Sequence, residues 1–306
     1  MENQFSSRRE FLQGAASLIG VSVLAPSFNF LANKPKLAFT TLGCPDWPFP
    51  DIVKFAAANH YEALEIRGIL RELDLPKVKE FSSPQKIAET RKLMKDNHLE
   101  FSDLGASAQM HHKDPVERKK QLDDGRRFID LAQQLGCPAV RVFPNNLPKD
   151  MEKDAAIELI ASGLHELAVY AQPSGVKVLM ETHGEMTQTG DIVKTMELAK
   201  HKLVGLVWDV VNMWSVTRES PSLVYPKIKT YIHHTHIKDA KFVDGKLKYV
   251  LLGEGEAPIF EAIDLLIKGG YNKYYSFEWE KLWHPEIEAP EVALAQFART
   301  MLQKYP

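Results

Sequence analysis

The chain has 306 residues, of which 44% are hydrophobic and 25% charged, and its formal net charge is −2. This composition is typical of a soluble globular protein, and a nearly neutral chain lacks the basic surface with which nucleic-acid-binding proteins attract phosphates. No apolar run reaches the ~18–20 residues that a membrane-spanning helix needs. We therefore expect no nucleic acid partner and no stable association with a membrane.

The first 33 residues differ in character from the rest. Arg8 and Arg9 precede Phe11-Leu12 and an uncharged run of small and aliphatic residues, and regular periodicity begins only near Lys36. A twin-arginine pair followed by a modest apolar segment is typical of a Tat export signal, although a disordered basic tail is the alternative. We predict a twin-arginine signal peptide over 1–33, the Tat export machinery as the partner of the precursor, and a periplasmic or otherwise exported mature protein.

Strand-like and helix-like patterns alternate after this segment. Strand patterns cover 36–43, 61–68, 99–107, 138–144, 176–184, 203–211, 232–239 and 274–280. Helical patterns cover 49–60, 83–98, 114–136, 153–175, 190–201, 222–231, 258–270 and 290–305. Because repeated strand–helix units imply a parallel sheet, and eight of them favour closure, we predict one α/β domain over 34–306, a single (β/α)8 TIM barrel.

Two local features add detail to this barrel. Asp244-Gly245 lies between segments in which polar and apolar residues alternate. This pattern predicts a β-hairpin insertion between the seventh strand and the seventh helix, over the barrel mouth. The two cysteines, Cys44 and Cys137, fall at opposite ends of the predicted barrel. Because a disulfide requires Cα atoms within about 7 Å, we expect two free thiols.

Four of the predicted strands carry, near their ends, a residue that can bind a hard divalent cation: Glu181, Asp209, His236 and Glu278. In a parallel barrel all four project into the mouth at the C-terminal face, where active sites of this architecture lie. Three carboxylates and one imidazole suit one divalent metal ion (Mn²⁺, Mg²⁺, Co²⁺ or Zn²⁺) acting as a Lewis acid. The alternatives for Glu181 and Asp209 are a salt bridge at the rim and a turn cap.

Two of these positions have a rival on the same strand face. His234 points the same way as His236, and Glu280 lies ~6.6 Å along the strand from Glu278. His236 is favoured because it lies further toward the C-terminal end of its strand. Glu278 is favoured because it follows the apolar run directly.

Taken together, these pieces resemble the xylose isomerase-like TIM-barrel superfamily, in its sugar phosphate isomerase/epimerase branch. The resemblance extends from about residue 36 to the end and includes an H-x-K-D turn at 236–239 and a G-E-G segment at 253–255. It implies that Glu181, Asp209, His236 and Glu278 hold one metal ion. It also implies that Glu181 and Glu278 are catalytic, removing and returning a proton α to a carbonyl through a metal-stabilised enediolate.

Further residues near the strand ends are candidates for binding substrate hydroxyls or for orienting the metal ligands. They are His183, Asn212, Lys238, Arg141 and Glu254. For the charged ones, the alternative is a salt bridge at the rim of the barrel. Asn212 stands where ketose 3-epimerases of the family carry a substrate-binding histidine, which disfavours simple ketose 3-epimerase activity.

We therefore predict an exported, metal-dependent isomerase or epimerase, which acts on an unphosphorylated keto-sugar because phosphorylated sugars are largely cytoplasmic. The alternative is a lyase or hydratase that acts on 3-keto-glycosides or their 2-hydroxy-glycal products at the same site. A non-catalytic sugar-binding barrel and a DNA-repair enzyme of the endonuclease IV type are less favoured, because the ligand set is complete and a three-metal, histidine-rich set is missing. The sequence is compatible with a homo-oligomer and leaves the sugar and the metal open.

Overall fold

The computed structural model describes residues 34–306, so the predicted signal peptide over 1–33 lies outside the described residues. The barrel strands are β1 (Lys36–Thr40), β2 (Ala63–Ile66), β3 (Glu100–Gln109), β4 (Ala139–Phe143), β5 (Lys177–Glu181), β6 (Val204–Asp209), β7 (Ile232–Ile237) and β10 (Tyr274–Phe277). The helices are α2 (Phe49–Ala58), α3 (Pro84–Asp96), α4 (Pro115–Leu135), α5 (Lys153–Tyr170), α6 (Thr189–Ala199), α7 (Val210–Thr217), α8 (Pro221–Ile228), α9 (Ile259–Lys268) and α10 (Pro290–Lys304).

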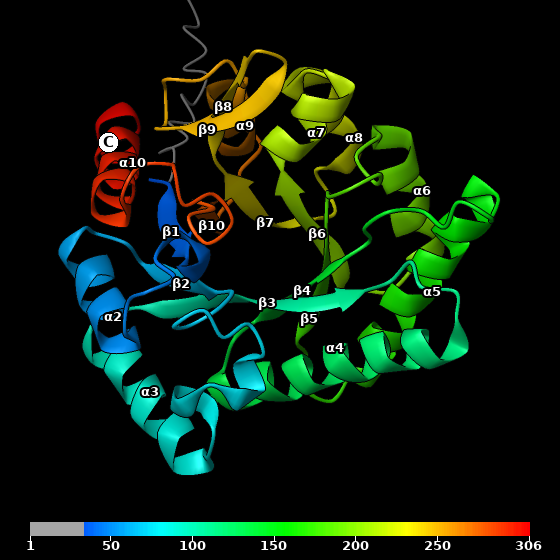
Figure 1. Cartoon of the computed structure of the whole chain (residues 1–306), viewed down its shortest axis with the longest axis horizontal. Helices are drawn as coiled ribbons and strands as arrows, with labels where there is room; N and C mark the ends of the chain where they lie inside the picture. The colour runs from blue at the N-terminus through cyan, green and yellow to red at the C-terminus, as the bar shows by residue number, and fades with distance from the viewer. Residues whose placement is uncertain (1–33) are drawn as a thin grey trace, which may run out of the picture. The chain divides into compact units, whose positions relative to one another are not determined.

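Within residues 34–306, eight parallel strands close into a barrel in the order β1-β10-β7-β6-β5-β4-β3-β2. β1 pairs with β2 on one side and with β10 on the other, so the last barrel strand closes the sheet against the first. The helices surround the barrel on its outside (Figure 1). The predicted single (β/α)8 barrel is confirmed.

The segment after β6 differs from its prediction. The sequence predicts a strand over 203–211 and one helix over 222–231, but β6 ends at Asp209 and α7 begins at Val210, ahead of α8. The β-branched Val210 and Val211 favour a strand by their own propensity. The helix forms nevertheless, because Asp209 Oδ1 accepts a hydrogen bond from the Asn212 amide at 2.8 Å and caps its first turn.

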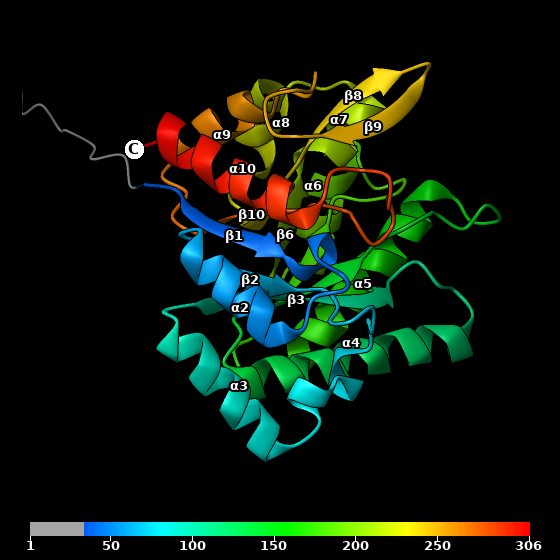
Figure 2. The same ribbon diagram turned by 60° about the vertical axis from the view of Figure 1, so that its left-hand side comes forward.

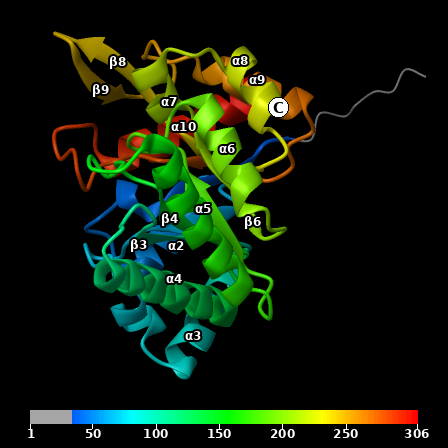
Figure 3. The same cartoon turned by 90° about the vertical axis from the view of Figure 1, so that its right-hand side faces the viewer.

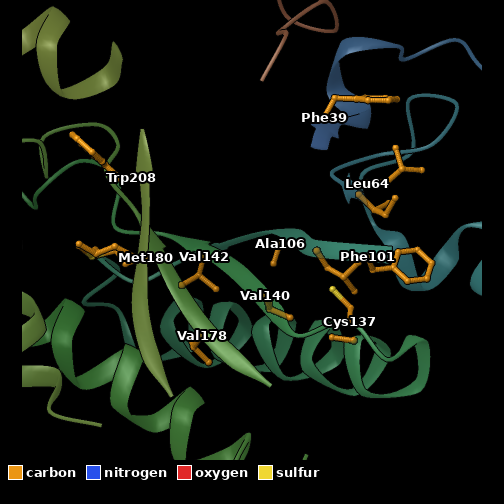
Figure 4. Close-up of a cluster of buried hydrophobic side chains, with 14 of the residues drawn as sticks. Phe39, Leu64, Phe101, Ala106, Cys137, Val140, Val142, Val178, Met180 and Trp208 are labelled. Carbon is orange, nitrogen blue, oxygen red and sulfur yellow. The ribbon is translucent and has the colours of Figure 1, made fainter. Parts of the chain in front are cut away.

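Most of the apolar core lies between the barrel and the helices. Val140 on β4 and Val178 on β5 belong to this layer, part of which Figure 4 shows. Alternate residues of a strand face the other side, and inside the barrel they form a separate, much smaller apolar cluster of Ala139, Leu179 and Val207. TIM barrels usually fill their interior with apolar layers. Here polar and charged side chains occupy much of the interior and must find partners there.

The predicted β-hairpin is confirmed between β7 and α9. β8 (Asp239–Val243) pairs antiparallel with β9 (Lys246–Val250), and both residues of the Asp244-Gly245 turn have positive φ, of 52° and 73°. This backbone suits an Asp-Gly turn. The hairpin extends from the end of the barrel toward which the β1 arrow points (Figure 2). Figure 3 shows the same hairpin, β8 and β9, projecting from the barrel.

The carboxylate of Asp239 holds the loop that follows the hairpin. Asp239 Oδ2 accepts hydrogen bonds from the amides of Gly253 at 2.8 Å and Gly255 at 3.1 Å. A Cβ on Gly255 would lie 1.9 Å from Asp239 Oδ1, so only glycine fits there. The G-E-G segment thus closes the loop around Asp239.

The cysteines and the apolar character of the helices bear on two further sequence predictions. Cys44 and Cys137 are both buried free thiols, as predicted. No helix within residues 34–306 combines the length and the apolar character needed to cross a membrane.

We predict that Phe297→Ala on α10 lowers the free energy of unfolding by about 3–5 kcal/mol, because it empties a packed aromatic site. Phe297 is fully buried and stacks on Phe277 of β10 with ring centroids 4.5 Å apart. Denaturant unfolding would measure the change. Val292→Ala, on the half-exposed face of the same helix, is the control and should change stability by no more than about 0.5 kcal/mol. Equal stability of the two variants would contradict the placement of the core.

Candidate metal centre and active site

The structure brings the four predicted metal ligands together. Glu181 and Asp209 are the last residues of β5 and β6, His236 lies opposite Asp209 on β7, and Glu278 follows β10 directly. One ligand atom from each of the four lies within 4.8 Å of the ligand atoms of the other three, and all four residues are buried. Parallel strands account for this, because their carboxyl ends meet at one face of the barrel.

The spacing of these atoms suits a bound cation better than direct hydrogen bonds. His236 Nδ1 lies 3.3 Å from Glu278 Oε1, 3.7 Å from Asp209 Oδ2 and 3.8 Å from Glu181 Oε1. Two ligand atoms that each lie about 2.1 Å from one ion are roughly 3–4 Å apart. His236 Nδ1 is buried and has no hydrogen-bond partner among the described residues. The donor set therefore fits a divalent metal ion, and the residues' role as ligands stays a prediction.

The two rival residues occupy other places. His234 Nε2 lies 2.9 Å from the carboxylate of Glu65 on β2 and is not one of the four clustered residues. Glu280 Oε1 accepts a hydrogen bond from Lys238 at 2.6 Å. The structure thus groups His236 and Glu278, the favoured members of each pair, with the other two candidates.

Lys238 is the main positive charge beside the cluster. Its ammonium, 1% exposed, lies 2.8 Å from Asp209 Oδ2, 2.7 Å from Glu278 Oε2 and 2.6 Å from Glu280 Oε1. The ammonium donates hydrogen bonds to Glu278 and Glu280, and it forms an ion pair with Asp209. The contacts make Lys238 an orienting residue for two candidate ligands, and its predicted contact with substrate stays untested.

Asn212 and Arg141 both contact the Glu181 carboxylate. Asn212 Nδ2 donates to Glu181 Oε1 at 3.2 Å, and Arg141 Nε lies 3.1 Å from Glu181 Oε2. Arg141 also donates to the Ala106 carbonyl at 2.9 Å and stacks over the Phe143 ring. Asn212, in the first turn of α7, thus contacts one oxygen of Glu181, and Arg141, on β4, contacts the other.

Arg67, on the segment after β2, brings a second buried guanidinium to the mouth. Its Nη2 donates to Ser107 Oγ at 3.1 Å, whereas its Nη1 is buried without a hydrogen-bond partner in the described part of the chain. Burial and then the neighbouring Arg141 lower the pKa of Arg67 to about 9. Both arginines pass over Gly105, where a Cβ would lie 2.6 Å from Arg67 Cδ and 2.9 Å from Arg141 Nη2.

The remaining predicted substrate residues lie outside the cluster. The half-buried His183 packs its ring 4.8 Å from that of Phe143. Glu254 is exposed in the loop that follows β9 and lines a cavity of about 320 Å³ with Tyr249 and His284. Their predicted roles stay untested.

The sequence analysis missed Glu65, the third residue of β2. Its Oε1 lies 3.1 Å from His236 Nε2, and its Oε2 lies 2.9 Å from His234 Nε2 and accepts a hydrogen bond from Ser276 Oγ at 2.8 Å. A carboxylate between the apolar Leu64 and Ile66 in a buried strand was the signal that could have revealed it.

Electrostatics favour a positive charge at this centre. Burial opposes protonation of His236, but Glu278, Glu65 and Glu181 outweigh it and raise the pKa of the imidazole well above its usual value. Burial likewise opposes ionisation of Glu278, but His236 and Lys238 hold the pKa of its carboxyl well below its usual value. Carboxylates that are kept ionised around one point attract a cation to it.

A sequence profile described as xylose isomerase-like TIM barrel matches residues 53–304, most of the chain. The chain belongs to this family. Inosose dehydratase 2 of Bacillus cereus is 26% identical over 227 residues, which are 69% of this chain and 73% of the relative. Inosose isomerase of Halalkalibacterium halodurans is 24% identical over 242 residues, 76% of this chain and 82% of the relative.

Solved structures share the family fold. The crystal structure of the IOLI protein with a bound zinc atom has a TM-score of 0.74 at 19% identity and covers 89% of this chain and 99% of its own. At this identity the likeness shows the barrel alone. The relatives that match by sequence are named as enzymes that act on small sugar-like molecules.

We predict that Lys238→Met lowers the free energy of unfolding by about 3–5 kcal/mol in chelator, because buried carboxylates lose their counter-charge. Added Mn²⁺ should recover part of this loss, since a cation at the cluster neutralises the same groups. Urea unfolding with EDTA and with excess Mn²⁺ measures both effects. Lys241→Met, which removes a half-buried lysine of β8 that is not part of the four-residue cluster, is the matched control. Wild-type stability of Lys238→Met in EDTA would show that the carboxylates do not depend on the ammonium.

Proposed function

We propose that this protein is a divalent-metal-dependent isomerase or epimerase of an unphosphorylated keto-sugar. It would move a proton on the carbon α to the substrate carbonyl. One observation carries the proposal: two buried carboxylates at the ends of non-adjacent strands, Glu181 and Glu278, face the same imidazole nitrogen, His236 Nδ1. This arrangement offers a proton carrier on each side of a substrate bound in the mouth.

The four clustered residues, Glu181, Asp209, His236 and Glu278, would hold the metal ion. When bound, an ion of the Mn²⁺, Mg²⁺, Co²⁺ or Zn²⁺ class polarises the substrate carbonyl and stabilises the negative charge that develops on its oxygen. The zinc atom in the IOLI structure supports a metal at a site of this fold.

The residues of the chain itself would hold and transfer the proton. Asn212 and Arg141 fix the Glu181 carboxylate, and Lys238 fixes Glu278 through Oε2. Fixed carboxylates can remove and return a proton without first reorienting. Arg67 Nη1, which has no hydrogen-bond partner within residues 34–306, can donate to a substrate hydroxyl or carbonyl oxygen.

The charge of the mouth supports a neutral substrate. Its carboxylates are those of Glu65, Glu181, Asp209, Glu278 and Glu280, and its cations are those of Arg67, Arg141 and Lys238. With His236 neutral as a metal ligand, five carboxylates against three cations leave two negative charges, which one divalent ion would cancel. Asp103 counts as neutral, because burial raises the pKa of its carboxyl well above the usual value. A balanced site offers no surplus positive charge for a phosphate group.

A lyase or hydratase is the second candidate. Removal of the same α-proton from a 3-keto-glycoside, followed by loss of the group on the next carbon, converts isomerisation into elimination and gives a 2-hydroxy-glycal. A hydratase would add water across the double bond of that 2-hydroxy-glycal. The dehydratase among the relatives supports this outcome, and the inosose isomerase supports the first. Both names refer to an inosose, a cyclic polyhydroxy ketone.

NMR of ketoses and 3-keto-glucosides incubated in D₂O with the Mn²⁺-loaded protein separates the two candidate functions. Exchange at the α-carbon alone indicates isomerisation or epimerisation, and release of the leaving group indicates elimination.

We predict that Glu278→Gln reduces turnover and α-carbon deuterium exchange by about 10²- to 10⁴-fold, because the amide can still offer an oxygen ligand but cannot carry the proton. Glu288→Gln, an exposed carboxylate in the following loop, is the matched control and should exchange at the wild-type rate. Loss of exchange in Glu280→Gln together with its retention in Glu278→Gln would move the proton carrier to Glu280.

The N-terminal segment supports a proposal about location. Arg8 and Arg9 ahead of an uncharged apolar run suit recognition by the Tat export machinery, which would deliver the barrel to the periplasm or otherwise outside the cytoplasm. Because Tat carries folded proteins, the metal would bind before export.

We predict that replacing both Arg8 and Arg9 by lysine retains the protein in the cytoplasm, because the twin arginines are the recognised feature of the signal. Cell fractionation of a strain that expresses each form measures the effect. The purified 34–306 domain should keep its activity, since the change lies outside it. Unchanged export of the double-lysine form would show that these arginines are not the signal.

A further inference from the structure

Glu65 connects three strands across the interior of the barrel. It lies on β2, whose neighbours are β1 and β3, yet its three hydrogen-bonding partners within residues 34–306 lie on β7 and β10. They are His234, His236 and Ser276, at 2.9, 3.1 and 2.8 Å from its carboxylate oxygens. The carboxylate is fully buried, and three donors compensate its removal from water.

The contact with His236 determines which ring nitrogen carries the proton. An ionised carboxylate can only accept hydrogen bonds, so His236 must present an N–H at Nε2 toward Glu65 Oε1. In the neutral ring the lone pair is then on Nδ1. That nitrogen faces the carboxylates of Glu181, Asp209 and Glu278 and makes no hydrogen bond within the described residues.

We infer that Glu65 is a positioning residue of the metal centre: it fixes His236 in the Nε2–H tautomer and aims the Nδ1 lone pair at the ion. This inference rests on the proposed metal-dependent function. A carboxylate that accepts a hydrogen bond from a ligating histidine also increases the basicity of the ring, and loss of such a partner typically costs 10- to 100-fold in metal affinity. His234 and Ser276 hold the second carboxylate oxygen and so set its orientation.

Glu65→Gln tests the role with almost no change of shape. The amide has one oxygen and one NH₂ group in place of two accepting oxygens, so it cannot accept from His234 and His236 through separate oxygens. Calorimetric titration of the chelator-stripped protein with Mn²⁺ should show an affinity about 10- to 100-fold below that of the wild type. Glu100→Gln is the matched control: it makes the same substitution on neighbouring β3, where the carboxylate accepts from Tyr274, and it should bind Mn²⁺ as the wild type does.

A second measurement does not depend on the variant folding. In the Zn²⁺-loaded wild-type protein labelled with ¹⁵N-histidine, long-range ¹H–¹⁵N spectra should show the His236 proton on Nε2 and the metal on Nδ1. The opposite assignment, or wild-type Mn²⁺ affinity in Glu65→Gln, would overturn the inference about Glu65 and leave the proposed function standing. A wild-type protein that binds neither metal would overturn both. Neither readout uses a substrate, so failure to find the sugar does not affect the test.

Discussion

The mouth of this barrel buries Glu65, Glu181, Asp209 and Glu278 close to one another, and their charges must be compensated where they lie. Burial of an uncompensated carboxylate costs several kcal/mol even after the protein relaxes. Lys238 supplies part of the compensation through its contacts with Asp209 and Glu278. Arg141 pairs with Glu181, and Glu65 is held on the other side of the His236 ring. One oxygen each of Glu181, Asp209 and Glu278 still faces His236 Nδ1, which is the physical basis for a cation site.

This constraint divides the barrel wall into two layers with different tasks. Residues such as Val140 and Val178 face the helices and supply the apolar burial that stabilises the fold. The alternate positions face inward, where Arg141 and Glu181 lie next to each other on β4 and β5. The period of two in a strand therefore lets one segment serve packing on one face and chemistry on the other.

Local structure at the strand ends links the fold to the site. Asp209 caps α7 through Oδ1 while its Oδ2 faces His236 and Lys238, so one carboxylate has both a structural and a site contact. Turn capping and metal binding, which the sequence offered as alternatives for this residue, are geometrically compatible. Asn212 on the same helical turn reaches Glu181, so the start of α7 orients two of the four candidate ligands.

The sequence by itself determined the parts that follow from periodicity and turn chemistry: eight strand–helix units, the Asp-Gly hairpin, and carboxylates and an imidazole at the ends of four strands. These features are local, so residue order alone carries them. The start of α7 was missed, because a side-chain cap overrode the strand propensity of Val210 and Val211. The links between distant residues were decided by the tertiary structure alone. Glu65 and His236 are 171 positions apart and meet only because the closed barrel brings the inward faces of β2 and β7 together, which no local pattern encodes.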